Sequence, residues 1–211
     1  MKTEVTISVM PRGVPSIVSR VSGFLRQQGG KMVLPSFETE RLWVRPRTMA
    51  DFDACLAMDR DPAVTRFIPG LWNDPVKHEA FLRERIETSL GDGLGYWSIF
   101  PKEQPDQFLG WILLIPYDGV GPEVEIGWRL NQSAWGNGFA LEAARPIVEH
   151  AFHTAGLERI VADIDPGNLS SQRVAERIGM KHIGDSKHGD DPCKCYVMTK
   201  ADLGEMVSRN S

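Results

Sequence analysis

A strand that runs through two glycines into a helix is the feature that most constrains this chain. The segment Val124–Leu130 suits a strand, and glycines at 136 and 138 precede a helical pattern. Glycine adopts backbone conformations barred to other residues and lets a ligand approach the main chain. The free amides and positive dipole of the first helical turn then form an anion site. This segment predicts a phosphate or pyrophosphate ligand, although the spacing alone also allows a plain strand-to-helix connection.

Two nucleotide-binding motifs can be tested on the same residues. A Walker loop ends in Gly-Lys-Ser/Thr, which the sequence lacks. A Rossmann fingerprint needs a third glycine where position 141 is Leu, and no leading βαβ unit precedes the loop. Asp163 does lie at about the distance expected of a ribose-binding acid. A nicotinamide oxidoreductase therefore stays a rival class, one that cofactor absorbance would reveal.

The chain around this motif mixes strand and helix patterns. Alternating apolar and polar residues predict a first strand near 38–46, and helical patterns follow near 49–59 and 75–89. Further strands are expected near 95–100, 108–116, 122–130, 159–164, 180–186 and 193–199, and further helices near 138–155 and 169–178. The sequence thus predicts a mixed α/β (α+β) domain over residues 37–200, with about seven strands and about four flanking helices.

The two ends are set apart from this domain. Residues 14–28 have the spacing of a short amphipathic helix, within a stretch of 31 residues that carries a net charge of +4. An accessory helix, upstream sequence translated before Met32, and a transit peptide or membrane-surface helix all stay open for it. We divide the chain into an extension over 1–36, the domain over 37–200 and a tail over 201–211.

Composition restricts the compartment and the partners. The longest strongly apolar run covers residues 108–117, too short for the about 20 residues of a membrane-spanning helix. Three cysteines exclude a disulfide scaffold and favour a reducing cytosol. The formal charge is −4, so the chain beyond residue 31 sums to −8, which favours cationic partners such as protonated amines. We expect a cytoplasmic protein that binds neither nucleic acid nor a membrane.

Two of these cysteines and two histidines belong to residue types that commonly bind metal ions. Cys193 and Cys195 are expected to point to opposite faces of a strand, and no Cys-x-x-Cys pair accompanies them. His182 and His188 add no spacing typical of a zinc site. We therefore expect no metal.

Four motifs occur in order along the chain: Thr39–Pro46, Glu125–Trp128, Trp135–Ala143 and Asn168–Met180. Together they resemble the GCN5-related N-acetyltransferases (GNAT), in the branch that contains the ribosomal-protein-alanine N-acetyltransferases, over residues 37 to about 200. The resemblance implies a GNAT fold in which two splayed parallel strands bind acetyl-CoA. It also implies acetyl transfer to a primary amine, either a protein N-terminus or a small molecule, and it allows a homodimer.

The resemblance places the cofactor along three segments. Amides of the glycine turn would bind the pyrophosphate, the preceding strand would polarise the thioester carbonyl, and an Asn–Ser pair would meet the pantetheine arm and its sulfur. These residues are Trp135, Gly136, Asn137, Gly138, Phe139 and Ala140; Ile126, Gly127 and Trp128; and Asn168 and Ser171. Trp135 and Asn137 stand where the family often has Gln or Arg and a basic residue, which reduces cationic help to the phosphates. Asn168 and Ser171 also suit a plain helix cap.

The implied reaction is direct attack of a neutral amine on the thioester in a ternary complex. Glu125 is the candidate base, acting through a water or holding the ammonium, and the alternative is an exposed strand residue. Many members of the family use a tyrosine as the general acid that protonates the departing thiolate, but this sequence has Ala175 at that position. Ser171 is the candidate acid in its place, with Tyr196 as a third candidate. The missing tyrosine also keeps open a catalytically weak CoA-binding module of the same fold.

Overall fold

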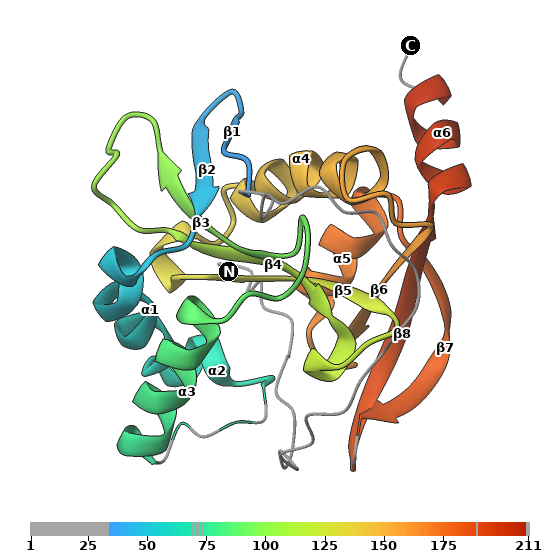
Figure 1. The fold of residues 1–211 in the computed structure, drawn as a ribbon. Coiled ribbons are helices and arrows are strands. Elements are labelled where there is room, and N and C mark those ends of the chain that lie inside the picture. The colour runs from blue at the N-terminus through green and yellow to red at the C-terminus, as the bar shows by residue number, and fades with distance from the viewer. Residues whose placement is uncertain (1–33, 69, 71, 73, 189, 210–211) are drawn as a thin grey trace, which may run out of the picture.

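The computed structural model describes residues 34–68, 70, 72, 74–188 and 190–209, which fold around one mixed sheet of eight strands (Figure 1). The strands lie in the order β1-β2-β3-β4-β5-β6-β8-β7. Their bounds are β1 (Phe37–Glu38), β2 (Leu42–Pro46), β3 (Gly95–Pro101), β4 (Gly110–Pro116), β5 (Val124–Leu130), β6 (Arg159–Ile164), β7 (Lys181–His188) and β8 (Asp191–Thr199). The mixed α/β class predicted from the sequence is confirmed.

The eighth strand comes from the segment expected to form a single first strand. β1 and β2 are antiparallel, with Phe37 opposite Val44, so the chain turns back on itself between them. Thr39 closes this turn: its backbone amide donates to the Leu42 carbonyl at 3.0 Å, and its Oγ1 accepts from the Leu42 amide at 3.0 Å. A turn without glycine or proline leaves the alternating pattern uninterrupted, which is why the sequence predicts one strand here.

Helices cover both faces of the sheet. Figure 1 shows helices both above the sheet and below it. The helices are α1 (Phe52–Asp59), α2 (Pro62–Thr65), α3 (Pro75–Glu87), α4 (Phe139–His153), α5 (Leu169–Arg177) and α6 (Lys200–Arg209). The short α2 was not expected, and α6 occupies most of the predicted tail. Within the described ranges, none of the helices combines the length and apolar character needed to cross a membrane.

The alternation of side chains assigns each strand residue to one helix layer. Arg129 of β5 bonds Asp59 of α1, so the odd-numbered residues of β5 face α1 to α3. The ring of Trp97 in β3 contacts His150 of α4, with centroids 5.6 Å apart, on the opposite face. Through the pairing of Trp97 with Ile112 and of Ile112 with Trp128, the even-numbered residues of β5 face α4.

The predicted extension enters the core at its end. Leu34 packs against the core, and the Pro35 carbonyl accepts a hydrogen bond from the fully buried indole of Trp97 at 2.7 Å. The amphipathic helix expected over residues 14–28 lies outside the described residues. The boundary at residue 36 therefore cuts through contacts that belong to the domain.

We expect a chain that starts at Met32 to fold and to bind acetyl-CoA as the full chain does. A chain that starts at Phe37 should instead lose about 1–3 kcal/mol of unfolding free energy, because it leaves the buried Trp97 donor without an acceptor. Chemical denaturation of both truncated chains measures the difference. Equal destabilisation of the two would contradict this assignment of Leu34 and Pro35 and place a stabilising role before Met32.

Candidate active site

A gap opens between β5 and β6 in the middle of the sheet. These strands are parallel neighbours, yet their register holds a single pair, Glu125 with Val161, near the start of β5. By contrast, β4 and β5 pair continuously from Gly110–Leu130 to Pro116–Val124. The two parallel strands therefore separate toward their carboxyl ends, as the sequence resemblance implies.

The peptide groups of β5 that face this gap can be identified from the ladder on its other side. The Asn131 amide donates across to the Leu109 carbonyl at 2.8 Å, and peptide groups alternate in direction along a strand. The Gly127 amide therefore belongs to the β4 ladder, whereas the Trp128 amide points toward β6 beyond the last pair. Of the two amides expected to polarise a carbonyl, Trp128 is placed to do so.

The glycine turn lies at the mouth of the gap. Gly136 and Gly138 both have a φ of +78°, a left-handed conformation that side chains other than glycine adopt at a cost. Within the part of the chain that the structure describes, no acceptor takes a hydrogen bond from the amides of residues 136–141. These amides border a cavity of about 220 Å³ between the start of α4 and α5. An unpaired row of amides at the positive end of a helix fits a diphosphate.

Two arginines that sequence reasoning missed line this cavity. Arg173 and Arg177 lie on α5, one turn apart and both exposed. They face the cavity together with Gly136, Gly138 and Ser170. They supply positive charge that Trp135 and Asn137 do not. Their i, i+4 spacing was visible in the sequence, but only the packing of α5 against α4 brings them to the glycine turn.

The side chains of Trp135 and Asn137 serve the turn itself. The Trp135 indole is buried and donates to the Leu130 carbonyl at 2.9 Å. Asn137 Nδ2 donates to the carbonyls of Ala134 at 3.3 Å and Trp135 at 3.2 Å. Both side chains thus stabilise the turn, and the buried Trp135 can offer a cofactor only its backbone. Phe139 and Ala140 form the first turn of α4 beside them.

The predicted Asn–Ser pair caps α5. Asn168 Oδ1 accepts from the Ser171 amide at 3.1 Å and from Ser170 Oγ at 3.2 Å. Both Asn168 and Ser171 are buried, as is Ile126 on the α4 face of β5. Asn168 thus caps the helix, and its hydrogen bond holds Ser171 in the first turn, at the positive end of the helix dipole. Tyr196, the third acid candidate, points to the α5 side, with its hydroxyl 3.5 Å from Glu176 Oε1.

Glu125 is buried, so the alternative of an exposed strand residue is wrong. Its exposed fraction is 3%, and it faces α1 to α3, opposite to Trp128. Within the described residues, its carboxyl group has neither a hydrogen bond nor an ion pair. Burial first, and then the negative charges of Asp163 and Asp118, raise the pKa of Glu125 well above its usual value. A carboxylate with a raised pKa binds a proton more strongly than an ordinary glutamate does, which suits a general base.

A hydrogen-bonded chain beside Glu125 was not visible from the sequence. The Tyr117 hydroxyl donates to Asp163 Oδ2 and lies 3.0 Å from His188 Nδ1. His188 Nε2 in turn lies 3.2 Å from Asp118 Oδ1. Burial and the adjacent Asp163 carboxylate raise the pKa of Tyr117, so its hydroxyl keeps its proton. The four residues come from segments up to 71 positions apart, and no local pattern links them.

Asp163 and His188 of this hydrogen-bonded network border a second cavity, of about 270 Å³, on the α2 side of the sheet. Its wall is rich in acidic side chains and also carries one arginine; the lining is Arg66, Phe67, Ile68, Asp163, Asp165, His188, Asp191, Pro192 and Cys193. Acidic walls favour a cationic ligand. The cavity therefore suits the amine acceptor more than the cofactor.

The expectation that Cys193 and Cys195 point to opposite faces is wrong. Residues two apart on a strand share a face, because side chains alternate with a period of two. The two sulfur atoms lie 3.9 Å apart, beside Asp163 of β6, which pairs with Cys195. The first of the reasons for expecting no metal, the opposite orientation of the two cysteines, therefore fails.

A sheet split between two parallel strands, with unpaired amides at the mouth and a buried carboxyl group at the closed end, fits a CoA-dependent transferase. Comparisons with known proteins agree. Residues 41–181 match the family described as Acetyltransferase (GNAT) domain. The chain is 31% identical over 146 residues to an uncharacterized N-acetyltransferase, YnaD, of Bacillus subtilis, which covers 69% of this chain and 82% of that protein.

Solved structures show the same fold. An acetyltransferase from Agrobacterium tumefaciens has a TM-score of 0.67 and 28% identity, covering 83% of this chain and 100% of that one. A spermidine N-acetyltransferase from Vibrio cholerae, in complex with CoA and spermine, has a TM-score of 0.63 and 13% identity, covering 77% and 97%, and this likeness concerns the fold. The chain belongs to the GNAT family. It is an acetyl-CoA-dependent N-acetyltransferase.

Proposed function

We propose that this enzyme transfers acetyl from acetyl-CoA directly to a primary amine within a ternary complex, with Glu125 as the base. The observation that carries the proposal is the position of Glu125. Its carboxyl group is buried, has no partner within the described residues, and lies where the parallel strands begin to separate. The acceptor is a protein N-terminus or a small amine, as in the branch that the sequence resembles.

The cofactor would enter from the α4 and α5 side. The amides of residues 136–140 and the exposed Arg173 and Arg177 suit the phosphates. Asn168 and Ser171 at the start of α5 suit the pantetheine end, and the positive first turn there would stabilise a departing thiolate. Ser171 then donates its hydroxyl proton to the sulfur and takes up in return the second proton that the attacking amine loses. In water a thiol has a pKa of about 8.5, so this step needs little help.

The acceptor would enter from the opposite side, where Glu125 and the acidic cavity lie. An amine arrives as an ammonium ion, since lysine-type amines have a pKa of about 10.4. Asp163, Asp165 and Asp191 attract that charge, and Glu125 takes the proton directly or through a water. The Trp128 amide would then stabilise the oxyanion that forms when the neutral amine attacks the thioester.

An amine panel assayed by release of free CoA thiol tests this proposal against its rival. Turnover that depends on a primary amine supports direct transfer. Binding of CoA without amine-dependent thiol release would instead indicate a catalytically weak CoA-binding module. Including N-terminal peptides and small polyamines in the panel separates the two acceptor classes, because only one of them should show saturation at low concentration.

We expect Gly138→Val to weaken acetyl-CoA binding by about tenfold or more, because a side chain disturbs the +78° conformation that aligns the amides. Gly156→Val is the matched control. Gly156 has a similar φ of +68°, no atom would lie within 4 Å of an added Cβ, and it follows α4 at the far end from the glycine turn. Calorimetry on both folded variants measures the difference. Equal affinities would refute the phosphate site.

A further inference from the structure

The thiols of Cys193 and Cys195, which lie beside Asp163, have no role in the transfer reaction as derived above. The two cysteines lie on β8 and Asp163 lies directly opposite Cys195 on β6. One ligand atom from each residue falls within 4.8 Å of the others. Cys193 is 5% exposed, so the cluster is not a chance grouping on open surface.

The spacing of the two sulfur atoms suits a tetrahedral metal ion. Two thiolates bound to zinc at about 2.3 Å with tetrahedral angles lie about 3.8 Å apart. The observed separation is 3.9 Å, so the sulfur atoms need almost no movement. Neighbouring strands of one sheet hold all three side chains. The ligand set, two soft sulfurs and one carboxylate oxygen, matches zinc rather than calcium or magnesium.

A disulfide between the same cysteines fits less well. Residues two apart on an extended strand have Cα atoms about 6.7 Å apart, near the upper limit for a disulfide. Closing the bond would also require the sulfur atoms to approach from 3.9 Å to about 2.05 Å, which bends the strand. Metal binding needs neither change.

The fourth coordination position would face open space. Cys193 and Asp163 both line the acidic cavity of about 270 Å³, and His188 and Asp191 line it as well. A water molecule can therefore complete the tetrahedron from the cavity side. Cysteine thiols have a pKa of about 8.5 in water, so at neutral pH both carry protons before a metal arrives. Those two protons leave as the ion binds.

We propose that Cys193, Cys195 and Asp163 form a binding site for a thiophilic divalent metal ion of the zinc class, open to the acidic cavity. One ion replaces two thiol protons and pairs with the existing carboxylate. No electron transfer is involved. The site is independent of acetyl-CoA, which we place on the other face of the sheet.

Cobalt(II) serves as the spectroscopic probe, because thiolate ligation gives an intense near-ultraviolet charge-transfer band. We expect the reduced, metal-free full chain to develop this band with one equivalent of Co²⁺ and to lose it when Zn²⁺ is added. Cys193→Ser and Cys195→Ser should each weaken binding by at least about tenfold, and Asp163→Asn should weaken it measurably. Far-ultraviolet circular dichroism of the metal-free variants establishes that they are folded.

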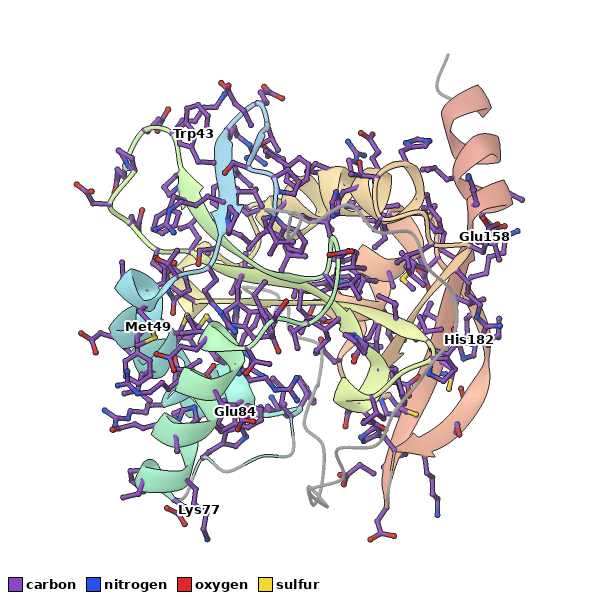
Figure 2. The ribbon with its side chains drawn as sticks, viewed as in Figure 1. Trp43, Met49, Lys77, Glu84, Glu158 and His182 are labelled. Carbon is purple, nitrogen blue, oxygen red and sulfur yellow. The ribbon has the colours of Figure 1, made fainter. Side chains whose placement is uncertain are left out.

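Two control variants separate this site from other ligands in the chain. Cys55→Ser makes the same chemical change in α1, away from β8, and should leave the band intact. His182→Ala removes an exposed histidine of the outer strand β7 (Figure 2) and should also leave the band intact; His182 Nε2 lies 2.9 Å from Asp185 Oδ1. Absence of a charge-transfer band, a band that survives the Cys193 and Cys195 substitutions, or binding lost with His182 would overturn the proposal.

Discussion

Replacing Asp59 with alanine is expected to lower the free energy of unfolding by about 3–5 kcal/mol. Asp59 lies in α1, where its Oδ1 accepts from Arg129 Nη1 of β5 and its Oδ2 lies 3.1 Å from His78 Nε2 of α3. Arg129 is 3% exposed and His78 is 1% exposed. The substitution leaves the guanidinium group of Arg129 buried without a counter-charge. The cost is therefore that of an uncompensated interior charge rather than of one lost contact.

A matched ion pair on the surface supplies the control. Arg60, the residue directly after α1, forms an ion pair with Glu79 of α3 at 2.8 Å, but the two side chains are 51% and 48% exposed. Glu79→Ala should therefore cost no more than about 1 kcal/mol. Urea denaturation of both variants gives the two free energies. Similar losses in the two would show that Arg129 reaches solvent and that its burial has little energetic weight.

The pH dependence of stability gives a second check on Asp59. Burial alone would raise the pKa of this carboxyl group, but the charge of Arg129 and hydrogen bonds from His78 and Arg129 lower it below the usual value. Because the folded-state pKa is the lower one, the ion pair stabilises the fold above the unfolded-state pKa of about 3.9. That stabilisation is lost as the pH falls through the folded-state value. The difference between wild type and Asp59→Ala should shrink in acid.

Local patterns predicted the elements that hold the site, because each depends on neighbouring residues. The strand at Val124–Leu130, the glycines at 136 and 138 and the helix after them follow from period, turn chemistry and helix-start signals within 20 residues. The burial of Glu125 does not follow from such signals. It depends on α1 to α3 covering that face of the sheet.

Local sequence patterns could not predict contacts between distant segments. Tyr117 and Asp163 meet because β4 and β6 flank β5, and Arg173 reaches the glycine turn because α5 packs beside α4. The error over Cys193 and Cys195 was of another kind. The strand itself was predicted correctly, and its period of two already places both sulfurs on one face.

Replacing Glu125 with glutamine is expected to lower kcat/KM for the amine by about 10²–10⁴-fold, the usual contribution of a general base. Glutamine preserves the size of the side chain but cannot take a proton. Acetyl-CoA affinity should change little, because the glycine-turn amides that suit the cofactor lie at the other end of β5. Stopped assays with saturating acetyl-CoA and varied amine, with calorimetry for the cofactor, measure both quantities.

Glu123→Gln is the matched control for this substitution. Glu123 lies two residues earlier, its side chain is 44% exposed, and its carboxylate is 3.3 Å from Arg159 Nε. We expect the Glu123 variant to keep its activity. A comparable loss of kcat/KM in both variants would show that the effect comes from the local charge and not from proton transfer by Glu125.

Stability and pH then separate a catalytic Glu125 from a merely structural one. The folded-state pKa of Glu125 is raised, so its buried charge costs stability as the pH rises above the unfolded-state value of about 4.3. At neutral pH the glutamine variant should therefore be at least as stable as wild type while being far less active. Its rate should recover in part at high pH, where more of the amine is neutral without a base. A variant that loses stability and keeps its activity would exclude Glu125 as the base and transfer that role to solvent or to another group at the acidic cavity.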